Sequence, residues 1–368
     1  EEKYKKFQTY SRENFRLSSL SSSLMFILTL MVFFLDGFAW LHGFLNQYVD
    51  SQIWLSMAFF GSVAVVSGII SLPFAIYDTF VIEEKYGFNT TTPKTFLLDM
   101  LKNLLLGLIV GGGILYLILS IYFATQTWFW LLAWGVITLF SVVMAEFYST
   151  LIVPIFNKQT PLEEGELRDK ISAFAEKAGF ELDNVYVMDS SKRSTRANAY
   201  FTGLGKKKRI VLFDSLVNGF ETDEIVAVLA HEIGHFKKKH IHKSLAISVL
   251  NTGVMLYLFG LFVGMDVFSK ALGVDEATFH IGAIAFGVLY TPLSEITGIF
   301  MNKFSRKNER EADDFAREHG QADDLVAALK KLAAKNLTNL TPHPWHVFLN
   351  YSHPPLGERI ERLQKKPA

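Results

Sequence analysis

His231 and His235 stand four residues apart, with Glu232 directly after the first histidine, in the run His231-Glu232-Ile233-Gly234-His235. On a helix this spacing places both imidazoles on one face, where they can bind one metal ion while Glu232 points at a metal-bound water. The HExxH pattern therefore predicts half of a zinc hydrolase site, with one Zn²⁺ per chain and Glu232 as general base. Because the chain has no cysteine, thiolate ligands are excluded and the metal must be held by histidine and carboxylate.

An acidic stretch downstream, Glu309-Arg310-Glu311-Ala312-Asp313, is the expected source of a third ligand. Glu309 and Asp313 are one helical turn apart, so Glu309 can complete a site with a fourth position open to water, and Asp313 can orient a ligand histidine. Taken alone, such a run is more typical of a solvated helix face. Lys238 and Ile241 occupy the positions where the metzincin pattern requires glycine and histidine, which excludes that class.

The segments around the motif are predicted from local signals. Thr222 is the expected N-cap of the motif helix, with Asp223 and Glu224 in the first turn, where negative charge suits the helix dipole. His240 and His242 follow among several lysines, and we interpret them as basic residues at a membrane surface rather than as ligands.

The composition indicates a membrane protein. Half of the residues are hydrophobic, 33 are phenylalanine, and the net charge is zero, so nothing points to a nucleic-acid partner. A span takes about twenty apolar residues. Six segments qualify: 20–41, 54–76, 104–124, 128–147, 244–265 and 281–301. Lysine and arginine concentrate before the first span, between the second and third, and after the fourth, which predicts that both termini and the HExxH segment are cytoplasmic.

A segment between the fourth and fifth spans resembles a small α+β unit. Thr160-Pro161-Leu162-Glu163 reads as a capping box that opens a helix. β-prone runs at 185–188, 199–202 and 209–213 predict a small sheet beside the motif helix, and Lys206-Lys207-Lys208-Arg209 predicts a solvated turn. Asn198 and Ala199 open one run, whose edge either binds an extended substrate or is purely structural.

The domain organisation that follows has four parts. Residues 1–156 form an N-terminal membrane bundle of four spans, and 157–242 form a cytoplasmic zinc-protease insert with the HExxH helix. Residues 243–301 add two spans, and 302–368 carry the third ligand and an HPPL motif.

The ordered motifs of the chain resemble those of the integral-membrane CAAX prenyl endopeptidase family, the HExxH zinc metalloproteases. The likeness covers nearly the whole chain and rests on these runs: Glu84 to Asn89, Pro154 to Asn157, Ser191 to Ser194, Asn198 to Tyr200, Arg209 to Asp214, His231 to His235, Ser305-Arg306 with Glu309 and Asp313, and His353-Pro354-Pro355-Leu356 with Glu358-Arg359. Arg196 and Ala197 depart from the family pattern. The resemblance also implies a bundle of seven spans, one more than the six counted here.

The resemblance implies a mainly α fold: a polytopic transmembrane helix bundle enclosing a chamber, with a cytoplasmic, gluzincin-like α+β metalloprotease domain. It implies that His231, His235 and Glu309 bind zinc and that Glu232 is the catalytic base. His353 and Arg359 are expected near the site, assisting the substrate or the transition state, and an imidazole at His353 can donate to an oxyanion.

The expected activity is cleavage near the C-terminus of a peptide or protein substrate of the prenylated, CAAX type, in contact with the lipid bilayer. Two alternatives stay open: a quality-control zinc protease without a prenyl requirement, and a transporter or channel. A bacterial inner membrane is the favoured location, with the endoplasmic reticulum membrane as the alternative.

Overall fold

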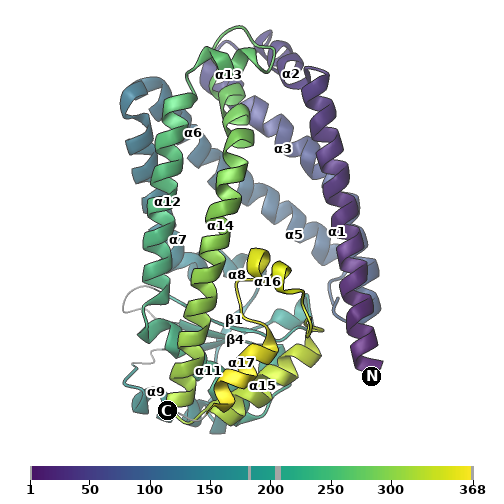
Figure 1. Ribbon diagram of the computed structural model, residues 1–368, viewed down its shortest axis with the longest axis vertical. Coiled ribbons are helices and arrows are strands. Elements are labelled where there is room, and N and C mark those ends of the chain that lie inside the picture. Colours follow the sequence, from purple (N-terminus) through teal and green to yellow (C-terminus); the bar gives the residue numbers. More distant parts are fainter. Residues whose placement is uncertain (1, 181–183, 204–208, 366–368) are drawn as a thin grey trace.

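The computed structural model describes residues 2–180, 184–203 and 209–365 of the 368-residue chain. Long helices run along the molecule, and a small sheet with shorter helices gathers at the end where both termini of the described chain lie (Figure 1). The long helices are α1 (Glu2–Phe34), α3 (Gln52–Tyr77), α5 (Pro93–Leu106), α6 (Gly112–Thr125), α7 (Phe129–Leu151), α12 (His240–Phe262) and α14 (Phe279–Glu318). Of the predicted turn at 206–209, Lys206 to Lys208 lie outside the described residues, and Arg209 is the first residue of a strand.

Within the described residues, five helical runs are long and apolar enough to cross a membrane: Tyr4–Phe34, Gln52–Tyr86, Pro93–Phe156, His240–Phe262 and Phe279–Glu318. The run Pro93–Phe156 contains two of the six predicted spans, which an interruption at Gln126 (φ 42°) separates. At most 17% of the most apolar stretch of any run is buried within the chain. These side chains are therefore left to lipid or to a wide interior.

The predicted first span, 20–41, was wrong in its bounds. Helix α1 ends at Phe34, and Asp36, in the left-handed conformation (φ 49°), separates it from α2 (Gly37–Asn46). This short helix and α13 (Asp266–Lys270) lie at the end of the molecule remote from the sheet (Figure 1). The left-handed backbone at Asp36 divides the predicted span into two helices.

The sheet has four strands in the order β1 (Gln159–Pro161), β2 (Asn184–Met188), β4 (Arg209–Phe213) and β3 (Ala199–Thr202). The central pair β2 and β4 is parallel, and the two outer strands are antiparallel to their neighbours. The three predicted strands are confirmed. The predicted helix start at Thr160 was wrong, because Thr160 pairs with Val187 in β1 and helix α9 begins only at Glu166.

The core of this end packs the sheet against α9 (Glu166–Lys177), α11 (Thr222–Lys237) and α15 (Ala322–Lys335). The helix that carries the HExxH motif is α11, and Ile225, Leu229 and Ile233 are almost fully buried along it. Its N-cap is Glu221 rather than Thr222: the Glu221 side chain accepts from the N3 backbone, and its own amide donates to Glu224. This reciprocal pair is a capping box that fixes the start of the helix.

Shorter helices complete the chain, namely α4 (Glu84–Tyr86), α8 (Val153–Phe156), α10 (Asp214–Val217), α16 (Pro344–Asn350) and α17 (Leu356–Gln364). Two π-helical turns, η1 (Asp78–Glu83) and η2 (Gly107–Gly111), continue α3 into α4 and α5 into α6. Helices α15 and α17 lie beside the sheet end of α14 (Figure 1). The C-terminal segment therefore returns to the end of the molecule that holds the HExxH helix.

Candidate metal centre

The close approach of α11 to α14 brings the HExxH motif to the acidic stretch. Gly234 lies at the contact, where a Cβ atom would stand 3.0 Å from Phe315 Cβ and 3.1 Å from both Cα and the carbonyl oxygen of Ala312. Such distances are below ordinary carbon contacts of about 3.5–4.0 Å. The missing side chain of Gly234 therefore sets how near Glu309 comes to the two histidines.

Three side chains converge between these helices, through two imidazole nitrogens and both oxygens of one carboxylate. The Nε2 atoms of His231 and His235 are 3.1 Å apart, Glu309 Oε1 is 3.2 Å from His235 Nε2, and Glu309 Oε2 is 3.5 Å from His231 Nε2. These residues form the group among the described residues that is able to hold a metal ion. Glu309 Oε2 is buried and has no aligned hydrogen-bond donor among the described residues, as expected for an oxygen that faces a cation.

Asp313 contacts the ring nitrogen of His231 that faces away from the cluster, and Arg359 in turn binds Asp313. Asp313 is fully buried, and its Oδ1 lies 2.9 Å from His231 Nδ1. Arg359, from α17, donates to both oxygens of the same carboxylate at 2.9 and 2.7 Å. Because Asp313 accepts from Nδ1, the His231 Nε2 lone pair is free to face the cluster. Burial lowers the pKa of His231, but hydrogen bonds to Asp313 and Glu309 raise it to about 9, so a metal ion that binds at Nε2 displaces a proton.

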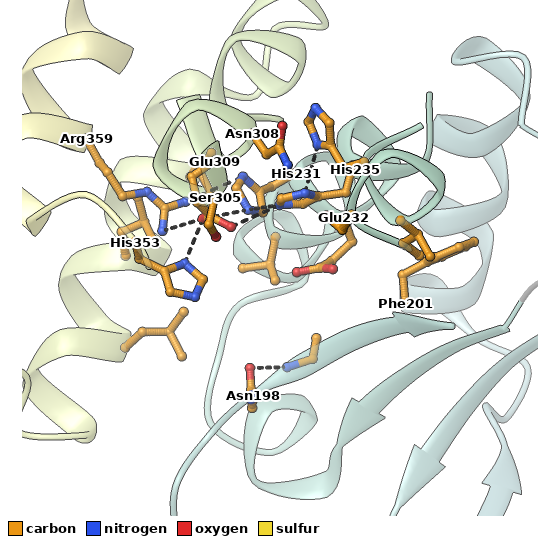
Figure 2. A pocket seen from close by; sticks show the side chains of 18 of the residues that line it. Asn198, Phe201, His231, Glu232, His235, Ser305, Asn308, Glu309, His353 and Arg359 are labelled. Carbon is orange, nitrogen blue, oxygen red and sulfur yellow. Dashed lines mark hydrogen bonds and ion pairs between the residues drawn. The ribbon is translucent and has the colours of Figure 1, made fainter. Parts of the chain in front are cut away.

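Glu232 extends from α11 into the space between the histidines and Asn198 (Figure 2). Burial raises the pKa of its carboxyl group. The space belongs to a cavity of about 660 Å³, whose walls include His231, Glu309, His353 and Arg359. An acidic group next to the metal ligands thus faces an open volume in which a substrate carbonyl can lie.

His353 reaches the cluster from the loop before α17. Its Nδ1 is 2.9 Å from Glu309 Oε2, and 63% of its side chain is exposed. The loop is held by Arg306, a buried residue of α14 that donates to the carbonyls of Val347, at 3.0 Å, and Tyr351. This anchoring role was not predicted, although Arg306 precedes Glu309 by one turn on the same helix.

Asn198 lies across the cavity from the histidines (Figure 2), directly before Ala199, the first residue of β3, and both residues line the cavity. Strand β3 pairs with β4 on one side and forms an outer edge of the sheet. Asn198 is exposed, and its side chain accepts from the Ala199 amide at 2.9 Å, which turns the chain into the strand. The structure therefore brings all nine predicted site residues to one cavity and its immediate support: His231, Glu232, His235, Glu309, Asp313, His353, Arg359, Asn198 and Ala199.

The interpretation of His240 as a membrane-surface residue was wrong. Its side chain is 3% exposed, lines the same cavity, and places Nδ1 3.0 Å from His235 Nδ1. His242 is exposed, as predicted. The lysine-rich run suggested a solvated surface, and no signal in the sequence indicates that the chain folds His240 back onto the motif.

Each half of the chain matches a known protein family. Residues 1–158 match the family described as CAAX prenyl protease N-terminal, five membrane helices, and residues 161–366 match peptidase family M48.

Relatives and a solved structure agree with these matches. CAAX prenyl protease 1 of Saccharomyces cerevisiae is 39% identical over 335 residues, which are 86% of this chain and 73% of the relative. The Homo sapiens homologue is 34% identical over 365 residues, covering 88% of this chain and 75% of the relative. A crystal structure of S. mikatae Ste24p superposes with a TM-score of 0.93 at 37% identity, covering 99% of this chain and 89% of that one.

Proposed function

Because the chain belongs to peptidase family M48 and is a multi-pass membrane metalloprotease of the CAAX prenyl protease type, we propose that it is a zinc endopeptidase that cleaves near the C-terminus of prenylated substrates. The observation that carries the proposal is the convergence of His231, His235 and Glu309 beside Glu232. Three ligands and a neighbouring carboxylate are the parts that a catalytic zinc site requires.

The spacing of the three ligand atoms supports zinc. In a tetrahedral site with bonds of about 2.0–2.1 Å, ligand atoms lie about 3.3–3.4 Å apart. The two Nε2 atoms are 3.1 Å apart, and each lies near a different oxygen of Glu309: His235 Nε2 is 3.2 Å from Oε1 and His231 Nε2 is 3.5 Å from Oε2. Acceptor atoms so close together repel one another unless a proton or a metal ion lies among them. Two imidazoles and one carboxylate, with no thiolate available, are a usual donor set for catalytic zinc.

In the proposed mechanism a bound zinc ion supplies Lewis acidity and makes water nucleophilic near neutral pH. Glu232 accepts the proton of the attacking water and passes it to the leaving amine. His353 donates a hydrogen bond to the oxygen that gains charge in the transition state. Asp313 and Arg359 act from outside the reaction by fixing the ring of His231.

The substrate backbone is proposed to pair with the outer edge of β3. A strand edge offers alternating amide and carbonyl groups that bind an extended peptide without reading its sequence. Pairing at Asn198 and Ala199 would place a peptide bond in the cavity between the edge and Glu232.

The prenyl group is proposed to lie against the apolar part of the cavity and the interior of the helix bundle, as a chamber would allow. Ile241 and Leu245 of α12 line the cavity, as do Leu325 and Leu329 of α15. Each methylene buried there contributes up to about 0.8 kcal/mol to binding. A lipidated peptide should therefore bind more tightly than its unmodified twin.

The site is proposed to face the cytoplasm, since the lysine and arginine distribution predicts this side for both termini and both lie at the sheet end of the molecule (Figure 1). The relatives named above are eukaryotic. They support the endoplasmic reticulum membrane as the location, rather than the bacterial inner membrane that was predicted from the sequence.

The test combines metal analysis with paired peptides, using the full chain purified in detergent. The parent should hold one zinc per chain, and His235→Ala should lose most of it. Glu232→Gln should keep the zinc but lose orders of magnitude in turnover, because an amide cannot accept the proton. Stoichiometric zinc in His235→Ala would refute the ligand assignment, and an active Glu232→Gln would refute the base.

Paired peptides separate the remaining alternatives. A farnesylated peptide should be cut with a lower KM than an unlipidated peptide of the same sequence. Equal cleavage of both would favour the quality-control protease. A transporter or channel requires neither zinc nor Glu232, so Glu232-dependent cleavage would exclude it.

A further inference from the structure

The break between α11 and α12 places a third imidazole behind the second metal-ligand candidate. Lys239 adopts the left-handed conformation (φ 57°) between the two helices, which costs a residue with a side chain about 1 kcal/mol or more. The turn directs His240 back toward α11, where its Nδ1 lies 3.0 Å from His235 Nδ1. On its other side, His240 Nε2 lies 3.0 Å from Glu311 Oε2.

The positions of the hydrogens in the series Glu311–His240–His235 follow from the carboxylate of Glu311. An ionised carboxylate only accepts, so His240 Nε2 carries a hydrogen and donates it to Glu311. A neutral imidazole holds one hydrogen, which leaves His240 Nδ1 as an acceptor. His235 Nδ1 must then donate to it. The lone pair of His235 is consequently on Nε2, the atom that lies 3.2 Å from Glu309 Oε1.

The position of Glu311 on α14 explains why an intermediate ring is needed. Successive residues of a helix are about 100° apart, so Asp313 shares a face with Glu309, whereas Glu311 is turned by about 200° from it. Asp313 reaches His231 directly, at 2.9 Å. Glu311 points away from the cluster and meets His235 only through His240.

We propose that His240 and Glu311 are positioning residues for the metal: they fix the tautomer and the ring orientation of His235. The inference rests on the proposed role of His235 as a ligand. It assigns the two ligand histidines different supports, a carboxylate with an arginine behind His231 and a second imidazole with a carboxylate behind His235.

A purely structural role predicts a different pattern of effects. Glu311 also lies 3.9 Å from Lys243 and 3.7 Å from Lys307, and its side chain is 29% exposed. If it serves only to tie α12 to α14 by charge, removal of these lysines should have consequences like those of removing Glu311. If it orients His235, the lysines should be dispensable.

The experiment measures zinc affinity of the full chain by competition with a chelator. Glu311→Gln and His240→Phe should each weaken zinc binding about 10- to 100-fold, the usual effect of losing such a support. The double variant should bind zinc no more weakly than the worse single variant, because both changes interrupt the same series of hydrogen bonds from Glu311 to His235. Glu311→Asp, which keeps the carboxylate, should recover part of the affinity. Lys307→Gln and Lys243→Gln, the matched controls, should bind zinc like the parent.

Thermal unfolding of the metal-free variants separates orientation from folding. Glu311→Gln should unfold near the parent temperature without metal and differ from it only when zinc is present. Parent-like zinc affinity in both Glu311→Gln and His240→Phe would overturn the inference, as would equal losses in the lysine controls. Zinc retained in His235→Ala would instead overturn the proposed function, so the two failures are distinguishable.

Discussion

Substitution of Gly234 by alanine tests whether the helix contact sets the geometry of the metal centre. The new methyl group would meet Phe315 Cβ at 3.0 Å and Ala312 Cα at 3.1 Å, each about 0.5 Å or more inside ordinary carbon contact. Ala312 Cα belongs to the α14 backbone and Phe315 Cβ is bonded to it, so no side-chain rotation relieves these close contacts. Helices α11 and α14 must therefore separate by about half an ångström.

The energy of this change has two parts of opposite sign. Overpacking at a tight contact costs typically about 1–3 kcal/mol. Alanine is favoured over glycine inside a helix by about 1 kcal/mol. The net loss of folding stability should then be small, about 0–2 kcal/mol. The metal centre should suffer more, because a shift of about 0.5 Å between ligands already exceeds the tolerance of a functional site.

The assay compares zinc affinity and melting temperature in Gly234→Ala and in a matched control, Gly298→Ala. Gly298 lies on α14, and a Cβ atom there would meet nothing within 4 Å. The control should be neutral or slightly stabilised and bind zinc normally, whereas Gly234→Ala should bind zinc at least tenfold more weakly. If Gly234→Ala binds zinc as tightly as the parent, the close contact does not position Glu309 and the reasoning is wrong.

Two further predictions concern the supports of the site. Asp214 accepts from Ser190 Oγ, Ser191 N and Ser215 N at 2.7–2.9 Å, and although burial raises its pKa, these bonds hold the pKa below the usual value. Its contribution is present above the unfolded pKa of about 3.9 and is lost as pH falls through the folded one. Melting scans from pH 7 to 3 should show Asp214→Asn destabilised by roughly 1–3 kcal/mol at pH 7, with the gap closing in acid; a constant gap would contradict this. Arg306→Met should lower kcat while zinc stays bound, because it removes the Nη1 group that donates to the carbonyls of Val347 and Tyr351; unchanged kcat would show that this anchor does not place His353.

The two parts of the candidate ligand set could be predicted from sequence because helical periodicity shows which side chains share a face, whereas their approach depends on the packing of α11 against α14. Four-residue spacing puts His231 and His235 on one face, and the same spacing relates Glu309 to Asp313. The strand edge at Asn198 was predictable for a similar reason, since β-branched and aromatic residues mark the runs that pair. These features depend on local chemistry, which the sequence states directly.

The misplaced features depend on competition between local and distant partners. Thr160 and Pro161 carry the signature of a helix start, yet pairing with Val187 and Tyr186 makes them a strand. Thr222 is a good N-cap by type, but Glu221 closes a reciprocal pair with Glu224 one residue earlier. At each position two structures satisfy the same backbone groups, and tertiary packing selects between them.

One helix supplies most of what the metal centre needs. Along α14 lie the third ligand candidate Glu309, the carboxylates Asp313 and Glu311 that support the two histidines, and Arg306, which anchors the loop of His353. The same helix continues into the apolar run that crosses the membrane. Because these groups belong to one rigid element, a tilt or shift of α14 relative to α11 would move all of them together. The tight contact at Gly234 is therefore the point through which a shift of α14 against α11 would reach the candidate ligands.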